Sequence, residues 1–254
     1  MASKSKLFRM FKAIGITSPS GIADKAVKRV LGDTGGDPAY ITENFSELVE
    51  QLQITAYDIY LEEQEKTGQR VIQEYLQTNI PESADRDEII TEAAAAFDEL
   101  DKFFLSLTQS RRQRAGVAFE DIIETLFKRL NYPFDEQPVL NGQPDFVLPS
   151  EAHFRTNAMD CIIFTSKRTL RERWRQIVTE GMRGLGFFLA SIDEKVSSQQ
   201  LEAMLEHRIY LVLPDSIIEK YEKYQDAVNA ISFETFFRDH LDPAMTRWKA
   251  NKVI

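Results

Sequence analysis

The spacing of hydrophobic residues changes near residue 108, and this change constrains the fold more than any other feature of the chain. Before residue 108, apolar residues recur at three- and four-residue steps, which is the period of an amphipathic helix. Beyond it, short apolar runs of strand length alternate with helical patterns. The sequence therefore predicts an α/β protein with two parts: an all-helical N-terminal domain, residues 1–107, and a second domain, residues 108–254.

The N-terminal part has the pattern of a helical bundle. Its periodic apolar positions are Phe45, Leu48, Leu52, Ala56 and Ile59, followed by Phe97, Leu100, Phe103 and Phe104. The glycine-containing stretch 32–37 and the polar stretch 81–87 interrupt these patterns and are expected to be loops.

The C-terminal part begins with one more helical pattern and continues with strand signals. The helix is predicted from Phe119, Ile122, Ile123, Leu126, Phe127 and Leu130. Strands are expected at residues 137–140, 145–148, 159–166, 186–192 and 208–213, and helices at 169–183 and 197–207. The last three strands are largely apolar, as in strands that are buried on both faces. This order predicts a mixed β-sheet with helices on its faces.

Composition limits the classes of protein to which the chain can belong. Hydrophobic residues make up 43% of the sequence, enough for a sizeable core, and no apolar run is long enough to span a membrane. The start of the chain lacks the pattern of a secretory signal, so we expect a soluble cytoplasmic protein without a membrane partner. The only cysteine, Cys161, is interpreted as a core residue. No glycine-rich phosphate loop occurs, which argues against a nucleotide cofactor.

The net charge of −9 argues against nucleic-acid binding, but its distribution does not. Two basic stretches stand out, residues 1–30 and 165–183. Candidate contacts to DNA phosphates in them are Lys4, Lys6, Arg9, Lys12 and Arg168. For the N-terminal stretch, an ordinary solvated face is an equally good interpretation.

Asp145 and Lys167 carry the first indication of chemistry. Asp145 directly precedes one predicted strand and Lys167 closes the next, so both side chains emerge at one end of the sheet if the strands pair. A carboxylate can hold Mg²⁺, and a neighbouring ammonium group can orient water or neutralise phosphate charge, which together favour hydrolysis of a phosphodiester. A second anionic ligand is needed, and Glu180 is a candidate. A helix starting at Lys167 would place Glu180 roughly 20 Å along its axis.

The order Pro144-Asp145, Ser166-Lys167 and Glu180 resembles the PD-(D/E)XK nucleases, in the variant of the CCGG family of type II restriction endonucleases (EcoRII, PspGI and NgoMIV). In that variant the acid normally two residues before the lysine, here Thr165, is displaced onto the next helix. The resemblance covers roughly residues 110–220. It implies a restriction-endonuclease-like mixed sheet, Mg²⁺ held by Asp145 and Glu180, and catalysis assisted by Lys167.

The resemblance also implies a base-reading element and a further acid. Arg171, Glu172 and Arg173 match the family's recognition triplet, and arginine pairs bidentately with guanine while a carboxylate accepts from cytosine. An ordinary exposed surface run is the alternative without the neighbouring motifs. A glutamate of the helix around residue 120 is expected near the metal. Glu120 fits the pattern better, and Glu124, one helical turn later, is the other candidate.

These observations predict a Mg²⁺-dependent type II restriction endonuclease of a prokaryotic cytoplasm. It would cut double-stranded DNA at a palindromic site with a CCGG or CCNGG core, as a homodimer or a larger even-numbered assembly. Two alternatives remain: a nuclease of the same fold that recognises DNA structure in repair or recombination, and a DNA-binding protein that does not cleave. The N-terminal domain is expected to supply dimer contacts or to touch DNA.

Overall fold

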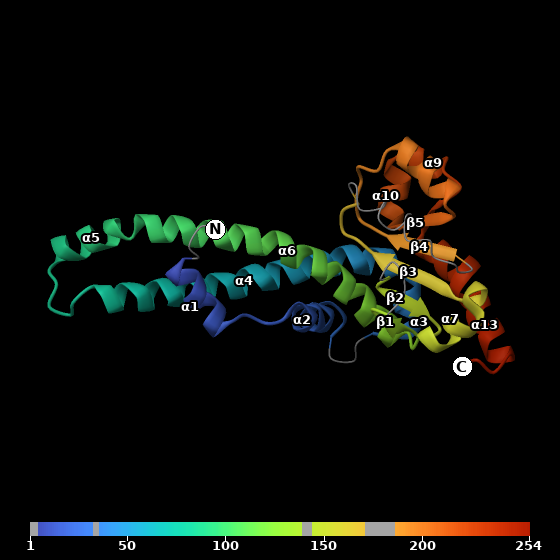
Figure 1. Ribbon diagram of the computed structural model, residues 1–254, viewed down its shortest axis with the longest axis horizontal. Helices are drawn as coiled ribbons and strands as arrows, with labels where there is room; N and C mark the ends of the chain where they lie inside the picture. The colour runs from blue at the N-terminus through green and yellow to red at the C-terminus, as the bar shows by residue number, and fades with distance from the viewer. Residues whose placement is uncertain (1–4, 33–35, 139–143, 171–185) are drawn as a thin grey trace.

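The protein consists of a long helical arm joined to a β-sheet covered by helices (Figure 1). The computed structural model describes residues 5–32, 36–138, 144–170 and 186–254, without the side chains of residues 112–113 and 115–118. The predicted fold class, an α/β protein with a mixed sheet and a helical N-terminal part, is confirmed.

The arm is built from two long helices that lie side by side, α4 (Phe45–Asn79) and α6 (Phe97–Arg129). With 35 and 33 residues and a rise of 1.5 Å per residue, each is roughly 50 Å long. The short helix α5 (Arg86–Ala95) joins them at the tip, after a break at the predicted polar stretch. The predicted apolar face of α4 is buried as expected, from Phe45 to Ile59.

Three short helices precede the arm: α1 (Lys6–Ile14), α2 (Pro19–Leu31) and α3 (Pro38–Glu43). The hydroxyl groups of Ser5 and Ser18 cap the first two by accepting backbone N–H groups, as is usual for serine at a helix start. α1 lays its apolar face on the arm, where Phe11 contacts the ring of Phe103 edge-on at 5.9 Å between ring centroids.

Helix α6 crosses the predicted domain boundary without a break, because the polar stretch 108–114 continues the helix instead of ending it. A single hydrophobic cluster combines α2 and α4 with the sheet. The division at residues 107/108 stays a prediction. The apolar pattern at the start of α6 is only partly buried, since Phe103 faces α4 whereas Phe97 and Phe104 are exposed.

One six-stranded sheet forms the second part, in the order β1-β2-β3-β4-β5-β6. β1 pairs antiparallel with β2 and β2 antiparallel with β3, whereas β3 to β6 are parallel. The strands are β1 (Asp135–Glu136), β2 (Phe146–Leu148), β3 (Ile162–Ser166), β4 (Gly186–Ala190), β5 (Ile209–Leu213) and β6 (Ala230–Ser232).

The central strands are apolar on both faces, as predicted, because two hydrophobic clusters sandwich them. In β3, Ile162 and Phe164 join the cluster that contains α4 and α6, while Ile163 joins the opposite cluster. The alternation follows from the two-residue period of a strand.

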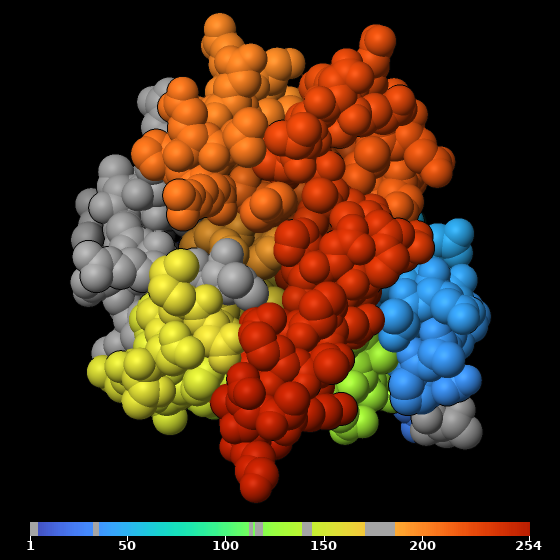
Figure 2. All heavy atoms as spheres, turned by 90° about the vertical axis from the view of Figure 1, so that its right-hand side faces the viewer, coloured from blue at the N-terminus to red at the C-terminus, as the bar shows by residue number. Residues whose placement is uncertain are grey.

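Helices cover both faces and the edges of the sheet (Figure 1). They are α7 (Glu151–Asn157), η1 (Ala158–Asp160), α9 (Ser198–Glu206), α10 (Asp215–Lys220), α11 (Glu222–Gln225), α12 (Phe233–Phe236), η2 (Phe237–Leu241) and α13 (Asp242–Ala250). In Figure 2 the red C-terminal segment with α13 lies beside the yellow segment with α7. Among the described residues, no helix has the length and apolar character needed to cross a membrane.

The predicted elements of this part differ from the structure mainly at their ends. β1 precedes the predicted strand 137–140, since Gln137 takes a left-handed backbone conformation with φ of +42° that ends the pairing; residues 139 and 140 lie outside the described part. β3 starts three residues later than predicted, because residues 158–160 form the turn η1. The predicted helix 169–183 lies mostly outside the described residues.

Candidate active site

The pairing of β2 with β3 brings Asp145 and Lys167 to the same end of the sheet. The two strands are antiparallel, and Phe146 lies opposite Phe164, so the residue before β2 is beside the last residues of β3. The backbone N–H of Asp145 donates to the hydroxyl of Thr165 at 3.3 Å. The two side chains that the sequence predicts to emerge together therefore do so.

Lys167 and Asp145 are in direct contact. The Lys167 Nζ atom lies 2.9 Å from Oδ1 and 2.8 Å from Oδ2 of Asp145, and the backbone N–H of Ser166 donates to Oδ2 at 2.7 Å. Asp145 is only 7% exposed. A carboxylate removed from water in this way requires charge-assisted hydrogen bonds, and the lysine and the backbone supply them.

A second carboxylate, that of Glu120 in helix α6, is close enough to this pair for their charges to affect it. Burial raises the pKa of Glu120, and the negative charge of Asp145 raises it further, whereas Lys167 and a hydrogen bond with the Gln137 side chain act in the opposite direction. The charges of Glu120 and Asp145 therefore act on each other directly. Of the two glutamates considered from the sequence, the structure brings Glu120 to the site.

Glu124 has other partners. It forms an ion pair with Lys128, whose ammonium group also lies 2.7 Å from Glu136. These contacts hold the Glu124 side chain in a surface network with the edge strand β1. Sequence spacing could not separate Glu120 from Glu124, because both lie on one face of the helix and only the partners of each decide the matter.

The described residues fit a divalent cation in part. The carboxylates of Asp145 and Glu120 are the hard oxygen ligands that Mg²⁺ prefers, and a bound cation would offset the effect of the Asp145 charge on the pKa of Glu120. No group of three or more His, Cys, Asp or Glu side chains suited to a metal occurs within the described residues. Glu180, the predicted second metal ligand, lies outside them, as do Arg171, Glu172 and Arg173.

The predicted phosphate contacts fall in two different places. Arg168, which follows Lys167, is exposed beside the site. The cations of α1 lie on the arm instead, where Lys6 and Lys12 sit over the rings of Tyr75 and Phe8. Arg9 is exposed on the same helix, and Lys4 lies outside the described residues. The structure thus does not bring the α1 cations and Asp145 together.

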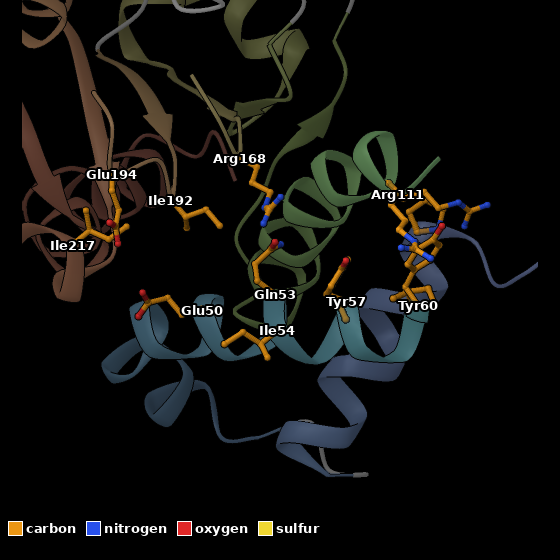
Figure 3. Close-up of a pocket in the computed structure, with 14 residues that line it drawn as sticks. Glu50, Gln53, Ile54, Tyr57, Tyr60, Arg111, Arg168, Ile192, Glu194 and Ile217 are labelled. Atoms are coloured by element: carbon orange, nitrogen blue, oxygen red, sulfur yellow. The ribbon is translucent and has the colours of Figure 1, made fainter. Parts of the chain in front are cut away.

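A cavity of about 320 Å³ opens beside Arg168, between α4, α6 and the segments that follow β3 and β4 (Figure 3). Its lining is mostly apolar and includes Ile54 and Tyr57, but two further arginines of α6 reach it. Arg111 donates to Gln64 at 2.6 Å, and Arg114 donates to the carbonyl of Thr17 at 3.1 Å. Neither arginine was predicted from the sequence as a site residue.

The Cys161 side chain is fully buried. Burial raises the pKa of its thiol to about 12, and the negative charge of Asp160 contributes to the same effect. The thiol stays protonated at neutral pH. This confirms the interpretation of Cys161 as a core residue.

Sequence similarity links the chain to a known protein family and to named enzymes. The family model described as EcoRII C terminal matches residues 78–237. The type II restriction enzyme SsoII of Shigella sonnei is 29% identical over 152 residues, which are 54% of this chain and 48% of SsoII. The type II restriction enzyme EcoRII of Escherichia coli is 30% identical over 149 residues, 56% of this chain and 36% of EcoRII. The chain thus spans about half or less of the length of these relatives.

Solved structures give a more extensive match. Metal-depleted Ecl18kI in complex with uncleaved, modified DNA has a TM-score of 0.75 and 26% identity, and the match covers 94% of this chain and 81% of Ecl18kI. A complex of the restriction endonuclease PspGI with substrate DNA has a TM-score of 0.60 and 22% identity, covering 89% of this chain and 93% of PspGI. Coverage of 94% means that the helical arm, for which the sequence suggested no relative, shares this fold as well.

Proposed function

Since the chain belongs to the EcoRII C-terminal family, we propose that it is a type II restriction endonuclease that cleaves double-stranded DNA at a specific site. The observation that carries the proposal is the contact of Lys167 with both carboxylate oxygens of Asp145 at the sheet edge, with Glu120 close to the pair. The DNA in the Ecl18kI and PspGI complexes supports duplex DNA as the partner.

Each charged group at the sheet edge has a distinct role in the proposed reaction. Asp145 and Glu180 would hold Mg²⁺, which supplies positive charge beside the scissile phosphate when bound. Lys167 keeps its ammonium group at the same place, where it can hold the attacking water and neutralise charge that develops on the phosphate. Glu120 adds negative charge near Asp145, which would favour a bound cation at this site.

Base recognition is assigned to the segment that follows the lysine. Arg171 and Arg173 would read guanines and Glu172 a cytosine in the major groove, which suits a half-site of consecutive G·C pairs. Both the CCGG and the CCNGG core satisfy this pattern. Phosphate contacts by Arg168, and by Lys4, Lys6, Arg9 and Lys12 of the N-terminal stretch, would fix the register without reading sequence.

The proposed assembly is a homodimer or a larger even-numbered oligomer. A duplex has two strands that must be cut, and one chain carries one copy of the Asp145–Lys167 pair. Two chains related by a two-fold axis would face the two strands of a palindromic site in the same way.

Digestion of plasmids of known sequence with Mg²⁺, followed by mapping of the cut ends, tests the proposed function. We expect discrete fragments whose ends share one palindromic core of the CCGG or CCNGG type. Ends that fall at branched or mismatched positions of any sequence would instead indicate a structure-specific nuclease. Binding without any cut would indicate a protein that does not cleave.

A further inference from the structure

We infer that Ser191 and Asp193, in the loop after β4, are positioning residues that fix the connector between the catalytic lysine and the base-reading triplet. The connector is residues 167–170, and its last residue, Leu170, directly precedes Arg171 in the sequence. The inference rests on the proposed function, since it concerns how recognition and cleavage are held in register.

Ser191 holds the first residue of the connector. It is fully buried, and its hydroxyl donates to the carbonyl of Lys167 at 2.7 Å. The backbone N–H of Lys167 donates to the carbonyl of Ala190 at 2.9 Å. Both backbone groups of Lys167 are thus bonded to the end of β4, which fixes the point from which the lysine side chain reaches Asp145.

Asp193 holds the last residue of the connector. Its Oδ2 atom accepts the backbone N–H of Leu170 at 2.9 Å, and its Oδ1 atom accepts the N–H of Lys195 at 3.0 Å. The N–H of Asp193 itself donates to the Ser191 hydroxyl at 3.1 Å. One continuous set of hydrogen bonds therefore links both ends of the connector, and hydrogen bonds to an ionised carboxylate are stronger than those between neutral groups.

Helix α11 contacts the loop that carries Ser191 and Asp193. The hydroxyl of Tyr224 donates to the carbonyl of Asp193 at 3.2 Å, and the Lys223 ammonium group donates to the carbonyls of Glu194 and Val196 at 3.0 and 2.6 Å. Helix α11 therefore braces the loop, so that the loop can serve as a fixed support for the connector.

Leu170 adds a hydrophobic anchor at the same point. Its side chain is 1% exposed. It packs in the hydrophobic cluster that includes residues of α9 and α10, on the face of the sheet opposite α4 and α6. The backbone bond to Asp193 and the buried side chain together fix Leu170, the last residue of the connector, relative to Lys167. Reactive groups and their supports must be held to within a fraction of an ångström for full effect, so we expect loss of the Asp193 bond to impair discrimination between sites.

The test measures discrimination directly. For the wild type and for Asp193→Ala, kcat/KM is determined on a duplex with the mapped site and on duplexes with one altered base pair. We expect Asp193→Ala to lower the ratio of these values at least tenfold, with little change in Tm. Asp193→Asn retains a carbonyl oxygen for the Leu170 N–H, so its ratio should stay within threefold of the wild type. A purely structural role would lower Tm and slow all duplexes equally, leaving the ratio unchanged.

Two further variants control the experiment. Asp226→Ala removes an exposed aspartate outside this hydrogen-bond network and should leave the ratio unchanged. Ser191→Ala removes the bond to the Lys167 carbonyl and should lower the ratio, which provides the same test if Asp193→Ala does not fold.

The possible results distinguish failure of the positioning role from failure of the proposed function. A wild type that cuts one site, with unchanged ratios in Asp193→Ala and Ser191→Ala, would overturn the positioning role and leave the proposed function standing. A wild type that cuts without sequence preference would overturn both.

Discussion

Asp121 and Glu120 are neighbours in α6, yet their carboxylates meet different surroundings. Glu120 is close to Asp145 and Lys167, while Asp121 is surrounded mainly by other acids. One carboxylate oxygen of Asp121, Oδ2, is buried and has no hydrogen-bond partner among the described residues. Burial, followed by the charges of Glu124, Asp24 and Glu136, raises the pKa of Asp121 to about 6.

Asp121→Asn should therefore stabilise the protein at neutral pH. The raised pKa means that the folded state favours the protonated form of Asp121. Ionisation of Asp121 therefore lowers the free energy of unfolding as the pH rises from about 4 to 6. An amide escapes this cost, and we expect a gain of about 1–2 kcal/mol at pH 8, after allowing for solvent screening. Urea unfolding at pH 8 and at pH 4 measures the gain, which should shrink at pH 4. An equal gain at both values would contradict the charge explanation.

Among individual residues, contacts that follow from the pairing of two strands could be predicted from the sequence. Contacts that also depend on a third strand or loop could not. Asp145 and Lys167 could be paired because each adjoins a recognisable strand. The network of Ser191 and Asp193 could not be predicted, since a serine and an aspartate after a strand usually mark an ordinary turn. Their role depends on the parallel pairing of β3 with β4, which the local sequence pattern does not predict.

Asp160 of η1 bonds to the C-terminal helix α13 and to α7. Asp160 accepts hydrogen bonds from Arg247 at 2.5 Å and from His153 at 2.9 Å, and its carbonyl accepts the indole N–H of Trp248 at 2.9 Å. Burial tends to raise the pKa of Asp160, but the hydrogen bonds from His153 and Arg247 outweigh it, so that the pKa lies below the ordinary value. Figure 2 shows the two segments in contact at the surface.

Asp160→Ala should lower the free energy of unfolding by about 1–3 kcal/mol at pH 7, because it leaves His153 and Arg247 without their acceptor. The lowered pKa means that this contribution is present above the ordinary pKa of an aspartate and is lost as the pH falls through the folded-state value. Thermal unfolding of the variant at pH 7 and in acid measures both effects. Asp239→Ala, which removes an exposed ion pair with Arg238, is the control and should change stability by less than about 1 kcal/mol.

Among the elements, the long periodic helices and the apolar strands of the sheet were predicted, whereas the shortest C-terminal elements were not. The apolar period locates α4 and the second half of α6 well, since both bury a continuous face. β6, with three residues, and the short helices of the C-terminal segment carry too few residues for a period to be visible. α5 buries no residue at all, so its capping aspartate, Asp85, is its main sequence signal.

At the scale of the whole molecule, α6 joins the arm to the sheet. The same helix contacts α1, α2 and α4 in the arm and carries Glu120 to the sheet edge. Residues 108–114 lie within this continuous helix, where Arg111 and Arg114 bond to Gln64 and to the Thr17 carbonyl.

Asp145 and Lys167 together form the proposed cleavage centre of a site-specific nuclease. The most direct measurement compares wild-type protein, Asp145→Ala and the exposed control Asp226→Ala on a duplex with the mapped site, scoring cleavage with Mg²⁺ and binding without it. We predict that Asp145→Ala lowers the cleavage rate on the order of 10²- to 10³-fold or more while keeping site-specific binding, and that the control matches the wild type. Mg²⁺-dependent cleavage by Asp145→Ala at the wild-type rate would show that Asp145 is not part of the cleavage centre.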